Sequence, residues 1–177
     1  MKNILLLRHA KSAWKDAALA DHDRPLSRRG ERAAKAIADQ IVAHAPRPDL
    51  ILCSTATRAR QTLAPLAKRL TSPGPPVSLE KDLYLVPEDA LLARLQRLPD
   101  EIGTVLLIGH NDGIGNLAAD LAGRGKAAIV AALQQKFPTG ALAVLQAPAR
   151  RWRELAVGSA ELTDFVRPRD LEGKERL

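Results

Sequence analysis

The chain has 177 residues, of which 46% are hydrophobic, and it carries a formal net charge of +7 at neutral pH. This length suits one domain with a sizeable core, and the hydrophobic content excludes general disorder. The positive charge favours anionic partners, such as phosphates, acidic proteins, nucleic acid or an anionic membrane, although many of the arginines are scattered along predicted helices.

The sequence contains no signal for export or membrane insertion. Its single cysteine, Cys53, cannot form an internal disulfide, so nothing demands an oxidising compartment. Arg8 interrupts the first apolar run, which is too short for a signal peptide. No apolar run approaches the length of about 20 residues that a membrane-spanning helix needs. We therefore expect a soluble, cytoplasmic protein.

Three short apolar runs predict strands that are buried on both faces of a sheet, at residues 4–7, 50–53 and 105–108. If these strands are parallel, the residues that follow them meet at one edge of the sheet, where α/β proteins usually bind ligands. The residues that would meet there include two arginines and two histidines, namely Arg8, His9, Arg58 and His110. Such a group suits an anion that is first held and then attacked.

Apolar residues at helical spacing predict four helices between and after these strands. Ser27 is the expected N-cap of the first helix, and Pro46 ends it. Pro87 begins the third helix, and the acidic residues that follow it suit the positive end of the helix dipole. The predicted helices cover residues 28–45, 56–70, 87–98 and 112–121.

The remaining segments complete the predicted fold. A short strand is expected at residues 77–79, and residues 123–136 form a looser, partly helical segment. Residues 140–147 and 151–157 predict a closing β-hairpin, and residues 172–177 a frayed tail. The sequence therefore predicts an α/β fold over residues 1–177: a single domain with three layers (α/β/α) and a mostly parallel central sheet.

In their order along the chain, the motifs resemble those of the histidine phosphatase superfamily, which also contains the phosphoglycerate mutases. That family begins with a strand ending in Arg-His-Gly, and it carries a second arginine and a second histidine after later strands. The corresponding residues here are Arg8-His9-Ala10, Arg58 and Gly109-His110. The sequences LRHAKS at 7–12, RPL at 24–26 and FPTG at 137–140 further resemble SixA-like phosphohistidine phosphatases, and the resemblance extends from residue 4 to about 171.

The resemblance implies a phosphoglycerate mutase-like fold and a phosphatase that forms a phosphohistidine intermediate without a metal or cofactor. It implies that His9 is the nucleophile, that Arg8, Arg58 and His110 are the other catalytic residues, and that Ser12 lies in the substrate site. For attack, the reacting nitrogen of His9 must be unprotonated. We expect the two arginines and a charged His110 to depress its pKa, and a backbone carbonyl to fix its tautomer.

Two departures from the family pattern concern the chemistry. Ala10 stands where the superfamily usually has glycine; some SixA-like members also have alanine at this position. No clear general-acid glutamate is present; the candidate acids are Asp21, Asp23, Glu80 and Asp82, each of which also fits an ordinary surface carboxylate. Arg24 either reaches the phosphoryl group or forms a salt bridge with one of the neighbouring aspartates.

Three other classes of function compete with this interpretation. A cysteine phosphatase needs five residues between its cysteine and arginine, whereas four separate Cys53 from Arg58. A metallohydrolase would place an arginine beside a metal ligand, and the histidine spacing suits no metal site. A non-catalytic nucleic-acid-binding protein would use the basic surface, but the interleaved aromatic residues of a stacking platform are missing.

The expected substrate is phosphohistidine on a protein, such as a phosphocarrier or histidine phosphotransfer domain. Residues 84–104 are barely long enough for one helix and a turn, so we expect no large lid over the site. An imidazole leaving group also needs a positioned acid less than an alkoxide does. The alternative within the same superfamily is a phosphatase of small phosphate esters; nucleic acid and membranes are not expected partners.

Overall fold

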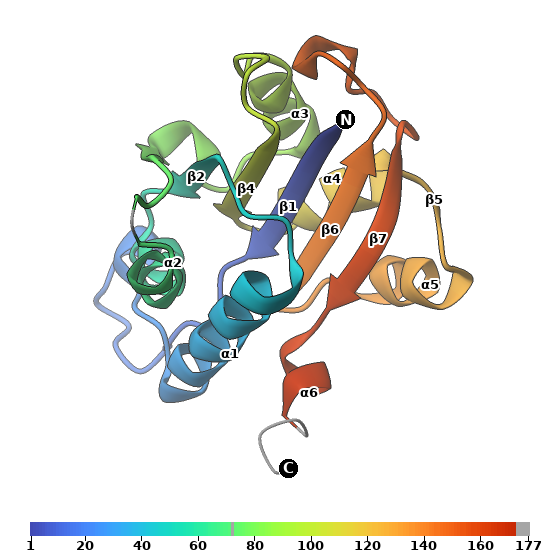
Figure 1. Ribbon diagram of the computed structural model, residues 1–177. Helices are drawn as coiled ribbons and strands as arrows, with labels where there is room; N and C mark the ends of the chain where they lie inside the picture. The colour runs from blue at the N-terminus through green and yellow to red at the C-terminus, as the bar shows by residue number, and fades with distance from the viewer. Residues whose placement is uncertain (72, 173–177) are drawn as a thin grey trace.

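The computed structural model describes residues 1–71 and 73–172 as a seven-stranded sheet between two layers of helices (Figure 1). The strand order in this part of the chain is β3-β2-β4-β1-β6-β7-β5. The strands are β1 (Lys2–Arg8), β2 (Leu50–Ser54), β3 (Val77–Glu80), β4 (Thr104–Gly109), β5 (Ala122–Gly125), β6 (Leu142–Ala147) and β7 (Ala160–Val166). The helices are α1 (Arg28–His44), α2 (Thr57–Arg69), α3 (Glu88–Gln96), α4 (Gly113–Leu121), α5 (Ala127–Gln135) and α6 (Pro168–Leu171).

The centre of the sheet is parallel, as predicted. β1 pairs in parallel with β4, which pairs in parallel with β2, and β2 pairs in parallel with β3. On its other side β1 pairs antiparallel with β6, and β6 pairs antiparallel with β7. The predicted α/β class, with a mostly parallel sheet and an antiparallel closing pair, is confirmed.

Alternate residues of the central strands point into two separate cores. Ile4 and Leu6 pack with the apolar faces of α3, α4 and α5, whereas Leu5 and Leu7 pack with those of α1 and α2. All four side chains are at most 1% exposed. This double burial is why the sequence of β1 reads as an unbroken apolar run.

The position predicted for the second strand of the hairpin, residues 151–157, is wrong. β7 begins at Ala160, and residues 152–154 within the predicted strand form a short 3₁₀ helix instead. Trp152 causes this turn, because its indole is fully buried and its Nε1–H donates to the Ile102 carbonyl at 2.8 Å. The preceding strand, β6, lies within the predicted range.

The segment after α4 was only partly predicted. α5 supplies the expected helical part, but β5, which pairs in parallel with β7, was missed because Ala122–Gly125 has no apolar pattern. Of the predicted tail, residues 173–177 lie outside the described residues. Within the described part of the chain, no helix is long and apolar enough to cross a membrane.

The start of α1 is fixed to the loop that follows β1. The Ser27 hydroxyl accepts a hydrogen bond from the Gly30 amide, which confirms the predicted N-cap. The Ser27 amide donates to the Lys11 carbonyl at 2.9 Å. A Cβ atom at Gly30 would lie 2.1 Å from that same carbonyl oxygen, so only glycine permits this close packing.

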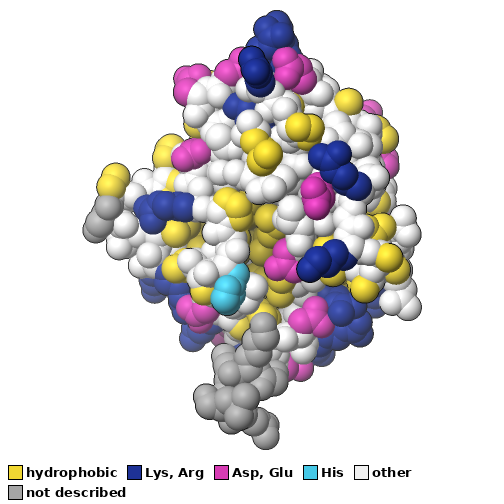
Figure 2. Space-filling view, turned by 45° about the vertical axis from the view of Figure 1, so that its right-hand side comes forward, with side chains coloured by type: hydrophobic (Ala, Val, Ile, Leu, Met, Phe, Trp, Pro, Cys, Tyr) yellow, Lys and Arg dark blue, Asp and Glu magenta, His cyan; other side chains and the backbone are white. Residues whose placement is uncertain are grey.

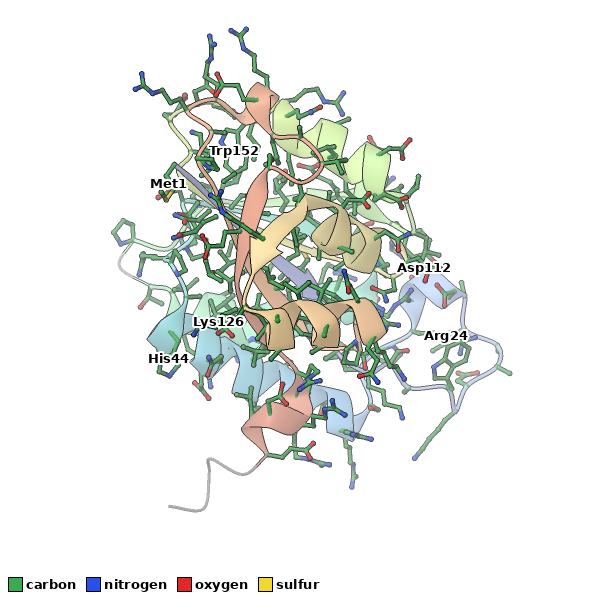
Figure 3. The ribbon with its side chains drawn as sticks, turned by 90° about the vertical axis from the view of Figure 1, so that its right-hand side faces the viewer. Met1, Arg24, His44, Asp112, Lys126 and Trp152 are labelled. Atoms are coloured by element: carbon green, nitrogen blue, oxygen red, sulfur yellow. The ribbon has the colours of Figure 1, made fainter. Side chains whose placement is uncertain are left out.

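The two ends of the sheet carry different residues. Figure 3 places Arg24 and Asp112 at the end where β1 and β4 finish, and Met1 and Trp152 at the opposite end. In Figure 2, basic and acidic side chains are interspersed over the visible face, with groups of Lys and Arg on its lower flanks. The Lys and Arg side chains visible on this face are therefore not spread evenly.

Candidate active site

The pairing of β1 with β4 brings two histidines together. Arg8 lies opposite Gly109, so the next residue of each strand, His9 and His110, emerges at the same edge of the sheet. The His9 amide donates to the Gly109 carbonyl at 3.0 Å, which extends the pairing by one residue. The two imidazole rings lie 5.1 Å apart between centroids and are inclined by 52°.

The hydrogen bonds of His9 assign its tautomer. Its Nδ1 lies 2.7 Å from the Ala10 carbonyl, which can only accept, so Nδ1 carries the proton. Its Nε2 accepts from Arg58 Nε at 3.3 Å and is therefore unprotonated. The side chain is 6% exposed. The ring thus presents a lone pair beside a guanidinium group, as expected of a nitrogen that can attack phosphorus.

His110 is held from the next strand of the sheet. Its Nε2 lies 2.8 Å from the hydroxyl of Ser54, the last residue of β2, and that oxygen also accepts from the Ala56 amide. Its Nδ1 lies 3.4 Å from Arg58 Nη2, which can only donate. Consequently Nε2 carries the proton and Nδ1 faces the guanidinium group of Arg58.

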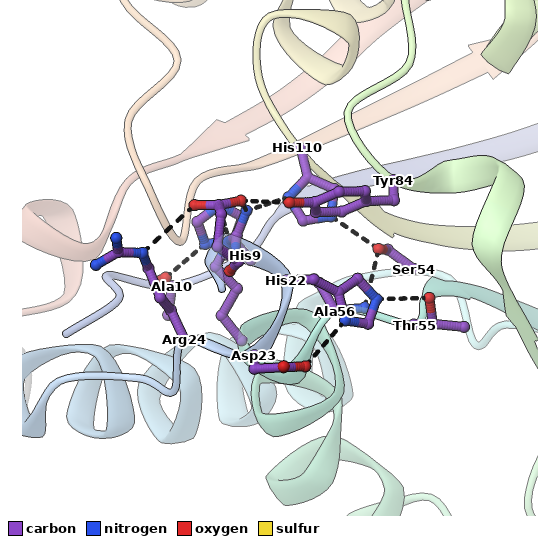
Figure 4. Close-up of polar contacts among 12 residues, drawn as sticks. His9, Ala10, His22, Asp23, Arg24, Ser54, Thr55, Ala56, Tyr84 and His110 are labelled. Carbon is purple, nitrogen blue, oxygen red and sulfur yellow. Dashed lines mark hydrogen bonds and ion pairs between the residues drawn. The ribbon is translucent and has the colours of Figure 1, made fainter. Parts of the chain in front are cut away.

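Arg58 is the residue that joins these groups. It lies in the first turn of α2, directly after β2, and it is 4% exposed. Besides the two histidines, it contacts Asp21: Nη1 donates to the backbone carbonyl at 2.6 Å, and Nη2 to Oδ2 at 2.9 Å. The planar guanidinium therefore has an anion and two imidazoles around it. Figure 4 shows His9 and His110 in this region, with His110 joined to Ser54 by a dashed line.

The Asp21 carboxylate accepts hydrogen bonds from two side chains and forms an ion pair with a third. Besides Arg58, the Tyr84 hydroxyl donates to its Oδ2, and Arg24 Nε lies 3.6 Å from its Oδ1. Arg24 also stacks on the Trp14 ring at 4.1 Å. The structure thus contains the salt bridge that was one of the two interpretations of Arg24. The Tyr84 and Arg58 contacts, opposed by burial, lower the pKa of Asp21, so this carboxylate is ionised at neutral pH.

Arg8 approaches the site from the other side. Its Nη1 donates to the Phe137 carbonyl at 2.9 Å, and the side-chain Nδ2 of Asn111 donates to the same oxygen at 3.1 Å. The loop between α5 and β6, which contains Phe137, turns at Gly140. The φ of Gly140 is +75°, and its amide donates to the His9 carbonyl at 3.0 Å. Among the described residues, Arg8 Nε is buried and has no hydrogen-bond acceptor.

These residues line an open cavity of about 820 Å³. Six of the predicted site residues contribute to its wall: Arg8, His9, Ser12, Asp21, Arg58 and His110. Of the four candidate acids, the lining includes only Asp21. Ser12 reaches the wall because it forms an isolated antiparallel bridge with Leu26.

The other candidate acids have different surroundings. Glu80 accepts two hydrogen bonds from Arg94, at 2.8 and 2.7 Å, which lower the pKa of its carboxyl group. Asp23 lies 3.3 Å from His22, and Asp82 lies in the 3₁₀ turn after β3 with an exposed side chain. None of the three lines the described cavity.

Burial keeps both histidines neutral. The pKa of His9 is lowered to about 4, chiefly by burial and then by the charges of Arg58 and Arg8, which outweigh the opposing hydrogen bond to Ala10. The pKa of His110 is lowered to about 3, again chiefly by burial and then by His9 and Arg58. The expectation of a charged His110 is therefore wrong for the protein without a bound anion, and the arginines are the smaller cause at His9.

Two competing chemistries can be compared with these surroundings. Burial raises the pKa of the Cys53 thiol to about 12, so it is protonated at neutral pH and a poor nucleophile. Within residues 1–71 and 73–172, no group of three or more His, Cys, Asp or Glu side chains is placed to hold a metal ion. The clustered nitrogen donors instead suit an anion that accepts hydrogen bonds.

Comparisons with known proteins agree with this geometry. The family model described as histidine phosphatase superfamily (branch 1) matches residues 4–84. An uncharacterized protein of Mycobacterium tuberculosis strain H37Rv is 39% identical over 165 residues, which cover 92% of this chain and 100% of the relative. Two solved structures are 32% identical to this chain. The putative phosphohistidine phosphatase SixA from Nakamurella multipartitia has a TM-score of 0.80 and covers 94% of this chain and 96% of its own. The putative phosphohistidine phosphatase SixA from Agrobacterium tumefaciens has a TM-score of 0.79, with 94% and 98% covered.

The chain belongs to the histidine phosphatase superfamily. It is a SixA-like member with a phosphoglycerate mutase-like fold, and it is a phosphatase of that superfamily. The resemblance predicted from the motifs around His9, Arg58 and His110 is thereby confirmed.

Sequence reasoning did not anticipate several neighbours of the predicted residues. Tyr84 follows the end of β3 by four residues, and Ser54 ends β2, so both lie at the same edge of the sheet as His9. The rule that selected the residues after the strands would have found them had it been applied to β3 and to Ser54. Asn111, which lines the cavity and contacts the Phe137 carbonyl, directly follows His110.

Replacing Asp21 by asparagine should strengthen the binding of inorganic phosphate by about tenfold. The Asp21 carboxylate occupies donors of Arg58 and repels a second anion at short range, and asparagine removes the charge at nearly constant size. Isothermal titration calorimetry with phosphate measures the change. Asp23→Asn is the matched control, because it removes the same charge two residues away, from a carboxylate that lies 3.3 Å from His22. Weaker phosphate binding by Asp21→Asn would show that holding Arg58 outweighs the repulsion.

His9 should make the folded protein less stable in acid. Its folded pKa of about 4 lies below the ordinary value of about 6.5, so the unfolded chain takes up the proton first as the pH falls. This contribution to stability is complete above pH 6.5 and is lost between about pH 6.5 and 4, to a total of roughly 3 kcal/mol. Urea titrations give the free energy of unfolding of each protein. As the pH falls across this range, the value for the wild type minus the value for His9→Gln should decrease by about that amount. Parallel pH dependences of the two proteins would contradict the low pKa.

Proposed function

We propose that this phosphatase removes the phosphoryl group from phosphohistidine on another protein, and that His9 carries that group in transit. The observation that supports the proposal most strongly is the unprotonated Nε2 of His9, which is held at the cavity wall with its Nδ1–H on the Ala10 carbonyl. A fixed tautomer and a low pKa supply a nucleophile at neutral pH without an adjacent base.

The proposed reaction has two displacements at phosphorus. First, His9 Nε2 forms a bond to phosphorus while the N–P bond of the substrate breaks, and the departing imidazole takes up a proton. Water then attacks the phosphorylated His9, so that phosphate leaves and the neutral imidazole is restored. Arg8 and Arg58 donate to the phosphoryl oxygens, and these contacts are expected to strengthen as charge develops in each transition state. His110 completes the catalytic set, and Ser12 and Arg24 are the proposed further contacts to substrate.

The surroundings of the carboxylates favour an imidazole leaving group. A departing alkoxide needs a proton from a positioned acid. Asp21, the one candidate acid on the described cavity wall, is ionised and bound to Arg58 and Tyr84. An imidazole is far less basic than an alkoxide and can be protonated before it departs, so its transfer depends less on such an acid.

The openness of the site supports a protein substrate. α3 is the helix after Tyr84, and its apolar residues Leu91 and Leu95 pack into the same core as α4, so this segment is not a lid. The partners that we propose are phosphorylated proteins such as a phosphocarrier or histidine phosphotransfer domain. The names of the two SixA relatives at 32% identity support this choice. The size of the cavity would also admit a small phosphate ester, which is the alternative substrate.

We propose that catalysis needs neither metal nor cofactor. Arginines supply the positive charge that a metal ion provides in many phosphatases. Activity that survives dialysis against a chelator would support this part of the proposal, and activity restored only by added metal would refute it.

Brief mixing with ³²P-labelled substrate should leave acid-labile label on His9. A phosphoramidate at a histidine survives alkali and is lost in acid, in contrast to a serine or threonine phosphate ester. Quenching the wild type in alkali, followed by digestion and mass spectrometry, locates the label. His9→Ala is expected to carry none. Acid-stable label, or label that persists in that variant, would remove His9 from the proposed role.

Turnover should be faster with phosphohistidine than with phosphate monoesters. The reason is the lower demand of an imidazole leaving group for a general acid. The measurement compares kcat/KM for a phosphohistidine-bearing protein and for free phosphohistidine with kcat/KM for a sugar phosphate and phosphoglycerate. Higher kcat/KM for a monoester, or transfer of the phosphoryl group between hydroxyl groups, would favour the small-molecule alternative.

A further inference from the structure

The described wall of the cavity carries more positive charge than one phosphoryl group requires. It contains seven lysines and arginines and a single carboxylate, that of Asp21. Arg8 and Arg58 lie beside His9, and in the proposed reaction they donate hydrogen bonds to the phosphoryl group. Arg167 is already neutralised, because it donates two hydrogen bonds to Asp170 at 2.9 and 3.0 Å.

Three of the remaining cations have no carboxylate partner among the described residues. Lys11, Arg29 and Lys136 each line the cavity, and none has a carboxylate oxygen within 4 Å in this part of the chain. They come from three separate segments: the loop after β1, the first turn of α1 and the end of α5. Their side chains are exposed. A second anionic feature of the substrate, beyond the phosphoryl group, would be needed to use them.

Two large apolar side chains stand among these cations. Trp14 and Leu85 also line the cavity, yet they are 69% and 53% exposed. Trp14 is not left to move freely, because the guanidinium group of Arg24 stacks on its ring at 4.1 Å. Leu85 is held with a φ of 52°, which side chains other than those of Asn, Asp and Gly rarely adopt. Tryptophan is among the side chains that most often contribute the binding energy of protein interfaces.

We propose that Lys11, Trp14, Arg29, Leu85 and Lys136 form a docking rim for an acidic surface of the protein that carries the phosphohistidine. This inference rests on the proposed function and adds the surface that recognises the substrate protein. The cations attract and orient the acidic partner, while Trp14 and Leu85 lose exposed area against it. The phosphoryl group then reaches His9 at the bottom of the cavity.

The composition of the rim favours a protein over other anions. A small phosphate ester would satisfy Arg8 and Arg58 and would leave Trp14 and Leu85 exposed to water. Single-stranded nucleic acid binds along successive aromatic platforms, whereas the rim offers one aromatic side chain, Trp14. An acidic protein surface can contact the cations of three segments and both apolar side chains together.

The test uses one charge reversal on the rim and one beside it. Arg29→Glu reverses a rim charge, and a glutamate in the first turn of α1 suits the helix dipole, so the variant should fold. Arg28→Glu is the matched control, because Arg28 is also exposed in the first turn but does not line the cavity. The two substrates are a histidine phosphotransfer domain of net negative charge, phosphorylated on its histidine, and free phosphohistidine.

Arg29→Glu is expected to lower kcat/KM for the phosphorylated domain at least tenfold, mainly through KM. Its kcat/KM for free phosphohistidine should stay within twofold of the wild type, and Arg28→Glu should stay within about threefold on both substrates. If both variants lost kcat/KM equally on the phosphorylated domain, the effect would be general charge attraction, and the proposed docking rim would be wrong. Equal losses of Arg29→Glu on both substrates would do the same. If the wild type turns over neither form of phosphohistidine, the proposed function itself fails.

Fluorescence gives a second readout that does not depend on activity. Trp152 is fully buried, so an emission change on adding the unphosphorylated domain would report on Trp14. The change should saturate, weaken with salt, and be lost in Trp14→Phe. An unchanged emission at concentrations above KM would overturn the contact with Trp14. Displacement of the domain by a single-stranded oligonucleotide at lower concentration would reassign the rim to nucleic acid.

Discussion

The parallel pairing of β1 with β4 is the constraint on which the site depends. It places Arg8 opposite Gly109, and therefore His9 beside His110, without any contribution from the loops. Both strands are buried on both faces, so a slip by one residue would turn the side chains of β1 into the wrong cores. The same packing that stabilises the sheet thus fixes the spacing of the two imidazoles.

Burial at this edge of the sheet has an electrostatic consequence. It lowers the pKa of both imidazoles far enough that they are neutral at pH 7. A bound phosphoryl dianion would reverse part of this effect, because a nearby negative charge favours the protonated imidazole. Binding of substrate is therefore expected to make His110 a better proton donor than it is in the free protein.

The sequence predicted those parts of the fold in which packing alone determines the residue pattern. β1, β2 and β4 were found because burial on both faces demands unbroken apolar runs, and α1 because Ser27 and Pro46 mark its ends. β5 was missed because its four residues have no apolar pattern. β7 was placed too early in the chain because the sequence does not show that Trp152 is buried in a turn that precedes the strand. In the candidate site, residues directly after strands were predicted. The contact between Asp21 and Arg58 was not predicted, because it depends on how the loop before α1 folds back onto Arg58.

Arg58 has two partners that catalysis would have to release. In the free protein its Nε–H donates to the His9 Nε2 lone pair, and its Nη2 donates to the Asp21 carboxylate. The first contact occupies the electron pair that the proposed attack requires, and the second occupies a donor that the phosphoryl oxygens require. A phosphoryl dianion is a stronger acceptor than a neutral imidazole, so its arrival would draw the guanidinium group away from Nε2. The proposed attack would then free the nucleophile only when a phosphoryl group is in place, and a single side chain, Arg58, would couple activation of His9 to binding.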